Sequence, residues 1–236
     1  IIMKITCKNS QKGNAVFLVL IGIGLFALLV FVISKGSRDA GNMELQEKDN
    51  LYASEITSYG NAIKNSMDQM IMLKNIDDNN SNGNGFLFSA PLANAIYGSF
   101  DSQPSTEVFN SEGGKVKYQK PREVACISKD QCSYEFTGQF EVNDAGDNNK
   151  TELAMVVLGL TEGVCKALNK NLGYDWSAIP IGTPLVLERF SGSNYRDGNG
   201  VNISGDSNEV LGKLRFCYQE GAGAKRYMYV HVLRAR

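Results

Sequence analysis

The sequence predicts an α+β protein. A long N-terminal transmembrane and amphipathic helix packs on a C-terminal, mainly antiparallel β domain with one short helix. Three observations lead to this prediction: an unbroken apolar run at residues 15–33, apolar positions at steps of three and four over residues 42–74, and alternating apolar positions further on. The 236 residues are 43% hydrophobic and 21% charged, which excludes a disordered chain.

The apolar run AVFLVLIGIGLFALLVFVI contains no polar side chain. As a helix rising about 1.5 Å per residue it would cover roughly 28 Å, close to the hydrocarbon thickness of a bilayer. A core helix of a soluble protein would show polar residues at the helical period. The run is too long for a cleaved secretory signal, and no A-x-A site follows it. We therefore expect a membrane-spanning helix.

The charges around this run predict its orientation. Three lysines and no acidic residue precede it, and Lys35 and Arg38 follow it, so residues 1–38 carry +5. Because the whole chain carries −1, residues 39–236 carry −6. The positive-inside rule then places the N-terminus in the cytoplasm and exports the C-terminal domain. A chain of this balance is not expected to bind nucleic acid.

The leader KITCKNSQKG ends at Gly13, directly before the apolar run. This junction resembles the leader of type IV prepilins, which a membrane peptidase cleaves after a glycine. The stretch QKGNAVFLVLIGIGLFALLVFVISKGSR, with TEGVCKALNKNLG and YMYVHVLRAR, is also similar to uncharacterised pilin-like proteins of alphaproteobacteria. The cut would lie between Gly13 and Asn14. Pilins usually carry Phe or Met where this chain has Asn14, and most major pilins carry Glu where it has Leu18.

The resemblance implies a structural, non-enzymatic subunit of a bacterial type IV filament or secretion pseudopilus. Its partners would be further copies or related pilins, the inner membrane and the prepilin peptidase. Gly22, Gly24 and Leu18 would lie where neighbouring helices pack. The alternative is a single-pass, signal-anchored periplasmic or surface binding protein. In that case the glycine-rich loop 191–208, with Tyr195 and Arg196, would contact a ligand.

The chain divides into a basic leader (1–13), a helical region (14–74), a polar linker (75–85) and an exported domain (86–236). In the amphipathic part of the helix the apolar positions share one face. They are Leu45, Tyr52, Ile56, Tyr59, Ile63, Met67, Met70 and Leu73. The linker IDDNNSNGNG is rich in turn-forming residues, which end the helix.

The exported domain carries strand patterns. Alternation predicts strands at 133–142 and 226–233, and shorter apolar runs add candidates. These candidates lie at 115–120, 153–158, 184–190 and 214–219. Residues 214–233 are predicted to form a hairpin, and residues 162–172 a helix that begins at the N-cap Thr161 and stops at Gly173.

The cysteines indicate disulfides. Cys7 would leave with the leader, so four cysteines remain in an oxidising compartment, and four cysteines allow three pairings. We favour Cys126 with Cys132, because the short segment CISKDQC can close as a turn; Cys165 would then pair with Cys217. The spacings match no zinc finger.

No motif predicts catalysis, a metal or a cofactor. His231 is the only histidine and falls in a predicted strand, and the chain has no nucleophile elbow and no phosphate-binding loop. Asp78–Gly83 matches half of a calcium loop, but Ser89 stands where a glutamate is needed. Asp197, Asp206 and Glu209 form a second weak candidate. Both segments are expected to be solvated loops.

Overall fold

The computed structural model describes most of the chain from residue 12 onwards. The described residues are 12–76, 85–90, 97, 99–147, 150–176, 178–182, 188–192, 195, 200–202, 208–221, 223 and 226–236; side chains are not described at 12–15, 33–42 and 208. The chain separates into two compact units, Ile1–Glu47 and Lys48–Arg236. The boundary falls inside the predicted helical region 14–74.

Helix α1 extends over Lys12–Lys74. In the second unit its buried face is formed by Ile56, Tyr59, Ile63, Met67 and Met70, at steps of three and four. The helix ends where the sequence predicts, because Asn75 takes a left-handed backbone conformation with φ 53° and its N–H returns to the carbonyl of Ile71.

The two outermost members of this predicted face are exposed. Leu45 and Leu73 are 63% and 81% exposed. Leu45 precedes the second unit, and Leu73 lies in the last turn of the helix. Helical spacing alone places them in line with the buried residues, but burial needs a partner, and the compact packing involves only the part of the face between them.

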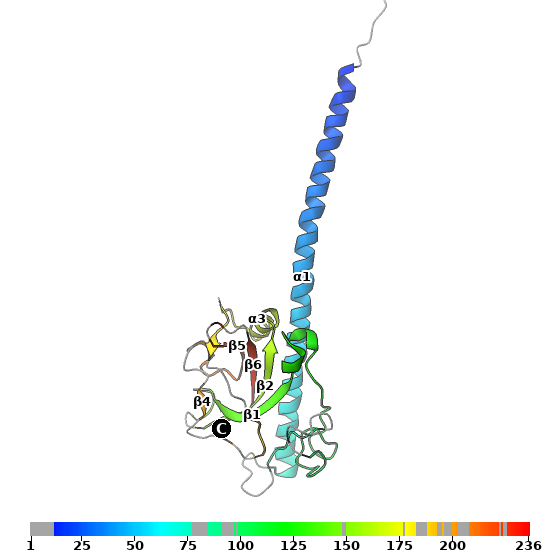
Figure 1. Ribbon diagram of the computed structural model, residues 1–236. Coiled ribbons are helices and arrows are strands. Elements are labelled where there is room, and N and C mark those ends of the chain that lie inside the picture. Colours follow the sequence, from blue (N-terminus) through cyan, green and yellow to red (C-terminus); the bar gives the residue numbers. More distant parts are fainter. Residues whose placement is uncertain are drawn as a thin grey trace, which may run out of the picture. The chain divides into compact units, whose positions relative to one another are not determined.

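Within the described residues, six strands form one sheet in the order β3-β5-β6-β2-β1-β4. The four central strands are antiparallel, and the two short outer strands run parallel to their neighbours (Figure 1). The α+β class and the antiparallel core are therefore confirmed. The strands are β1 (Tyr134–Glu141), β2 (Glu152–Leu160), β3 (Ile181–Gly182), β4 (Val201–Asn202), β5 (Arg215–Glu220) and β6 (Tyr227–Arg234).

Both faces of the sheet are buried. One face, with Phe136, Met155 and Tyr229, packs against α1 residues 53–70 and against α3 (Glu162–Asn171). The other face, with Val156 and Val230, forms a second apolar core with loop residues. Successive strand residues point to opposite faces, so the central strand β2 is apolar at every position from Leu153 to Leu158. The strand β1 instead keeps alternation, with Glu135, Thr137 and Gln139 buried as polar residues.

Helix α3 begins as predicted: the Thr161 hydroxyl accepts a hydrogen bond from the N–H of Val164 at 3.3 Å. Short 3₁₀ turns occur at η1 (Glu123–Ala125), η2 (Lys129–Gln131) and η4 (Asn208–Val210). The predicted hairpin 214–233 is confirmed by the antiparallel pairing of β5 with β6.

Residues 115–120 do not form the predicted strand. The Tyr59 hydroxyl of α1 donates to the carbonyl of Lys117 at 3.4 Å and accepts from the N–H of Gln119 at 3.3 Å. This side chain occupies backbone groups that a neighbouring strand would need. In the other unmatched candidate, 184–190, the described residues 188–190 are not in a strand and residues 184–187 lie outside the described part.

Candidate assembly helix and surface sites

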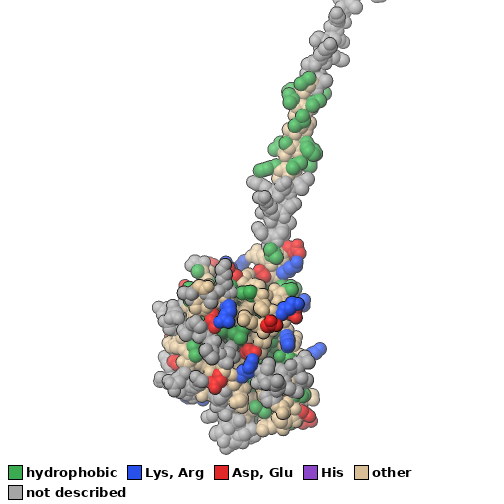
Figure 2. Space-filling model, in the orientation of Figure 1, with side chains coloured by type: hydrophobic (Ala, Val, Ile, Leu, Met, Phe, Trp, Pro, Cys, Tyr) green, Lys and Arg blue, Asp and Glu red, His purple; other side chains and the backbone are tan. Residues whose placement is uncertain are grey.

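The described apolar side chains of the first unit are exposed. The large ones, from Val16 to Val32, range from 43% exposed at Ile21 to 69% at Phe26. Figure 2 shows apolar side chains along this stretch of helix. Soluble monomers rarely expose contiguous apolar surface of this extent, since its hydration is unfavourable. This stretch therefore requires an apolar environment that the described chain does not provide.

The predicted packing residues lie within this exposed stretch. Leu18 is 63% exposed, and a Cβ added at Gly22 or Gly24 would meet no atom within 4 Å. The two glycines leave a shallow place on the helix where another backbone could approach closely.

Two findings concern the predicted cleavage site and the predicted membrane-spanning helix. Gly13 and Asn14 lie in the first turn of α1, and their surroundings are outside the described side chains. Within the described residues, no helix has an apolar stretch of the length that crossing a membrane requires.

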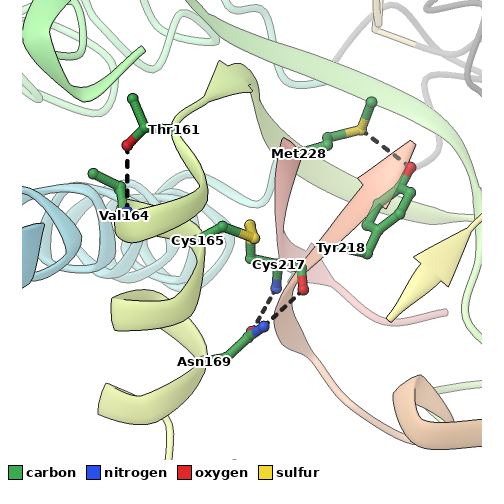
Figure 3. The surroundings of a disulfide bond; sticks show 7 residues. All are labelled: Thr161, Val164, Cys165, Asn169, Cys217, Tyr218 and Met228. Atoms are coloured by element: carbon green, nitrogen blue, oxygen red, sulfur yellow. Dashed lines mark hydrogen bonds between the residues drawn. A yellow bond between two sulfur atoms is a disulfide. The ribbon is translucent and has the colours of Figure 1, made fainter. Parts of the chain in front are cut away.

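Two disulfides are present among the described residues of the C-terminal domain, in agreement with the expected disulfide bonding. Cys126 pairs with Cys132, and Cys165 with Cys217, which is the favoured one of the three pairings. The first closes a short loop before β1. The second joins α3 to β5 across the core, so that this helix is covalently held on the sheet (Figure 3).

Asn169 completes this junction. Its carboxamide donates to the carbonyl of Cys217 and accepts from the N–H of Cys217, both at 2.8 Å (Figure 3). The side chain therefore pairs with β5 as a neighbouring strand would, on the part of β5 that lies beyond β3. An open strand edge invites pairing with another chain, and this contact closes it.

The opposite edge of the sheet is closed in the same manner. Along β1, the Tyr97 hydroxyl accepts from the N–H of Phe136, and the carbonyl of Phe136 accepts from the N–H of Phe190, both at 2.8 Å. The Gln139 side chain accepts from the N–H of Glu188 at 2.8 Å. In the described part of the chain, neither β5 nor β1 offers a long open edge for a partner strand.

Two buried carboxylates form ion pairs beside a cavity of about 230 Å³. Glu135 is held by Arg189 at 2.9 Å and also accepts from the Tyr97 hydroxyl at 2.7 Å. Glu220 is held by Arg226 at 3.0 Å. Burial, and next the charge of Glu135, raise the pKa of the Tyr97 hydroxyl. These carboxylates are occupied by their partners, which favours a structural role.

The histidine is buried. His231 contacts the Tyr229 hydroxyl through Nδ1 at 3.3 Å. Burial, and then the charges of Arg215 and Lys64, lower the pKa of His231 to about 3. The ring is therefore neutral at ordinary pH, as expected for a structural histidine in a strand.

The predicted ligand loop is described only in part. The Tyr195 ring packs on Phe190, with centroids 5.0 Å apart, and the Arg236 guanidinium lies 3.7 Å from its centroid. Tyr195 is thus engaged by its own chain, whereas Arg196 lies outside the described residues.

The calcium candidates also lie largely outside the described part, which includes neither Asp78–Gly83 nor Asp197 and Asp206; Glu209 is exposed. Where the structure does describe side chains, no group of three or more His, Cys, Asp or Glu residues is placed to hold a metal ion.

Two further cavities were not predicted from the sequence. One, of about 520 Å³, lies between α1 and residues 119–125, beside the Arg122–Glu55 ion pair. The other, of about 310 Å³, lies at the end of α3 and includes Trp176, the only tryptophan. The sequence did contain a signal for the second cavity. Its only tryptophan lies two residues after Tyr174, in the turn that follows the predicted helix 162–172.

Comparisons with known proteins add no relative: the chain matches no protein family, no curated protein and no solved structure.

Proposed function

We propose that this chain is a pilin-like structural subunit of a bacterial type IV filament or secretion pseudopilus. The observation that supports the proposal most strongly is the exposure of the apolar side chains from Val16 to Val32. Such a surface is stable only in lipid or against other apolar helices, and a subunit that moves from membrane to filament needs both.

Before assembly, residues 15–33 would lie in the inner membrane with the basic leader in the cytoplasm. A prepilin peptidase would then cleave between Gly13 and Asn14. Removal of the leader matters because Lys4, Lys8 and Lys12 could not enter an apolar filament core without a large desolvation cost. Cleavage therefore makes the helix compatible with helix-to-helix packing.

In the assembled state, helices of neighbouring copies or of related pilins would pack side by side. Gly22 and Gly24 would allow close approach, and Leu18 would lie among the contacts. The closed edges at Asn169 and Tyr97 support the same conclusion, because they disfavour assembly by strand addition. The exported β domain would form the outer surface, outside the cell or in the periplasm.

The test is the N-terminus of the mature protein. Sequencing the membrane or filament fraction should give Asn14 as the first residue, and Gly13→Val should block processing because a branched side chain replaces the small residue at the cut. Gly36→Val, which makes the same change beyond the apolar run, should leave processing intact. An N-terminus that retains Lys4, Lys8 and Lys12 would contradict the proposal.

A second candidate function is a signal-anchored surface binding protein, which the half-buried aromatic pair Tyr174 and Trp176 favours. It shares the membrane helix but keeps the leader. Cross-linking separates the two. In a Cys7→Ser background, Leu18→Cys and Leu25→Cys should give disulfide-linked copies in a filament, while Ser102→Cys, an exposed domain position, serves as the control.

A further inference from the structure

The cavity at the end of α3 has the size of a small-ligand site. Its volume is about 310 Å³, at the lower end of the range of about 300–1,000 Å³ found for such sites. Lys166 and Lys170, both exposed, form one side from the helix. Tyr174, Asp175 and Trp176 form the other side from the turn that follows.

Tyr174 and Trp176 form a stacked pair. Their ring centroids are 4.6 Å apart at an interplanar angle of 17°, and both rings are only partly buried. The Lys213 ammonium lies 5.2 Å from the Tyr174 centroid, a cation–π contact that holds the pair from the neighbouring loop. The pair thus presents flat apolar surface at the wall of a cavity that is open to solvent.

The charge around this aromatic pair is positive. Lys170 forms no ion pair with any residue that the structure describes, whereas Lys166 pairs with Glu162 at 2.6 Å. Arg215 is close enough that its charge opposes the burial that raises the pKa of Tyr174. Among the described residues, the cavity wall thus carries two lysines and one acid, Asp175, with Lys213 and Arg215 beside Tyr174, although residues 39–236 as a whole carry −6.

We infer that this cavity binds an acidic polysaccharide through a pyranose ring that carries a carboxylate. The apolar face of the sugar would pack on Trp176, its carboxylate would pair with Lys170, and its hydroxyls would donate to Asp175. A phosphodiester chain such as poly-dT fits less well, since it has few hydroxyl groups that could donate to Asp175. This inference does not depend on filament assembly.

The single tryptophan provides a direct measurement. The full chain in detergent micelles is titrated with polygalacturonate while indole fluorescence is excited at wavelengths that tyrosine does not absorb. Saturable quenching or a spectral shift is expected, and it should diminish near 1 M salt, where the screening length is about 3 Å. Dextran, a neutral polymer, should cause no change. Absence of a response to polygalacturonate, or an equal response to dextran, would overturn the inference.

Variants test the assigned residues. Lys170→Gln should weaken binding about tenfold, the loss expected for one charged hydrogen bond, and Lys170→Arg should restore it. Tyr174→Leu should also weaken binding, and it keeps Trp176 as the fluorescent reporter. Lys120→Gln removes an exposed lysine beside the other cavity and should have no effect. Equal affinity in Lys170→Gln and Lys120→Gln, or tighter binding of poly-dT than of polygalacturonate, would contradict the assignment.

Discussion

The backbone of Gly60 in α1 lies directly against the imidazole of His231 in β6. A Cβ added at Gly60 would overlap Nδ1 and Cε1 of His231 and lie 2.9 Å from the Met155 methyl group. His231 and Met155 are both fully buried in the sheet. The close approach of helix and sheet at this point therefore depends on the absence of a side chain at residue 60.

We predict that Gly60→Ala destabilises the C-terminal domain by about 1–3 kcal/mol, the usual cost of overpacking a core. The cost arises because a rigid ring, rather than a flexible side chain, would have to move. Thermal unfolding of the full chain in micelles, followed by Trp176 fluorescence, measures it. Gly22→Ala, where the added Cβ meets open space, should leave the transition unchanged; equal stability of the Gly60 variant would contradict this packing.

The pH dependence of stability should reflect two buried groups with opposite effects. Burial lowers the pKa of His231 to about 3. The contribution of the neutral ring to the free energy of unfolding is therefore lost as pH falls from about 6.5 towards 3. Burial raises the pKa of Glu152 to about 7, so its contribution is present below about 4.5 and is lost as pH rises through 7. Between about pH 4.5 and 6.5 the two slopes offset each other.

Glu152→Gln should remove one of these slopes. Its Oε2 accepts from the N–H of Val142 at 2.9 Å, and a glutamine oxygen can accept the same bond. As pH falls from 6.5 to 4.5, the free energy of unfolding of the variant should decrease by about 1.4 kcal/mol per pH unit. That of the parent protein should stay constant over the same range. Unfolding midpoints across this pH range provide the measurement, and parallel profiles for the two proteins would refute the assignment to Glu152.

Much of the fold follows from local sequence, which explains which predictions were confirmed. The Thr161 cap, the end of α1 at Lys74 and the β5–β6 hairpin each depend on residues close in the chain. Two-residue strands such as β3 and β4 carry no periodicity that a sequence pattern could reveal.

The surface sites depend on distant residues, and sequence reasoning reached them only in part. The apolar stretch of the helix was predictable from the unbroken apolar run at residues 15–33. Tyr59 contacts the backbone of residues 117–119, where a strand was predicted. These contacts join parts of the chain about sixty residues apart, so local sequence does not reveal them. The cavity at Trp176 depends on α3 and on Lys213 meeting in space.

Asn169→Leu should destabilise the domain by about 1–3 kcal/mol, because the backbone N–H and carbonyl of Cys217 would remain buried without their partners. It should also expose part of the β5 edge and increase self-association of the domain. Asn171→Leu, the same substitution at an exposed position of the same helix, is the matched control. Light scattering and thermal unfolding measure both effects, and identical behaviour of the two variants would argue against this role.

The two disulfides should contribute unequally. Cys165 and Cys217 are 52 residues apart, and Cys126 and Cys132 only six. Loss of loop-closure entropy in the unfolded chain gives about 4 kcal/mol for the longer loop and about 2 kcal/mol for the shorter one. Paired Cys→Ser variants of each bridge, compared by thermal unfolding, should show this order, and the reverse order would be inconsistent with it.

Filling the open surface at Gly22 and Gly24 should weaken association between copies without preventing membrane insertion. Gly22→Ile with Gly24→Ile makes the run more apolar, so insertion should be retained, but the added side chains would separate neighbouring helix backbones. Cross-linking through Leu18→Cys in the Cys7→Ser background should fall about tenfold, the equivalent of about 1.4 kcal/mol. Leu25→Ile with Leu29→Ile introduces the same branched side chains without adding volume, and it should cross-link as the parent does. If the glycine variant cross-links as well as this control, the helices do not meet at the glycines, and another face of residues 16–32 must carry the contact.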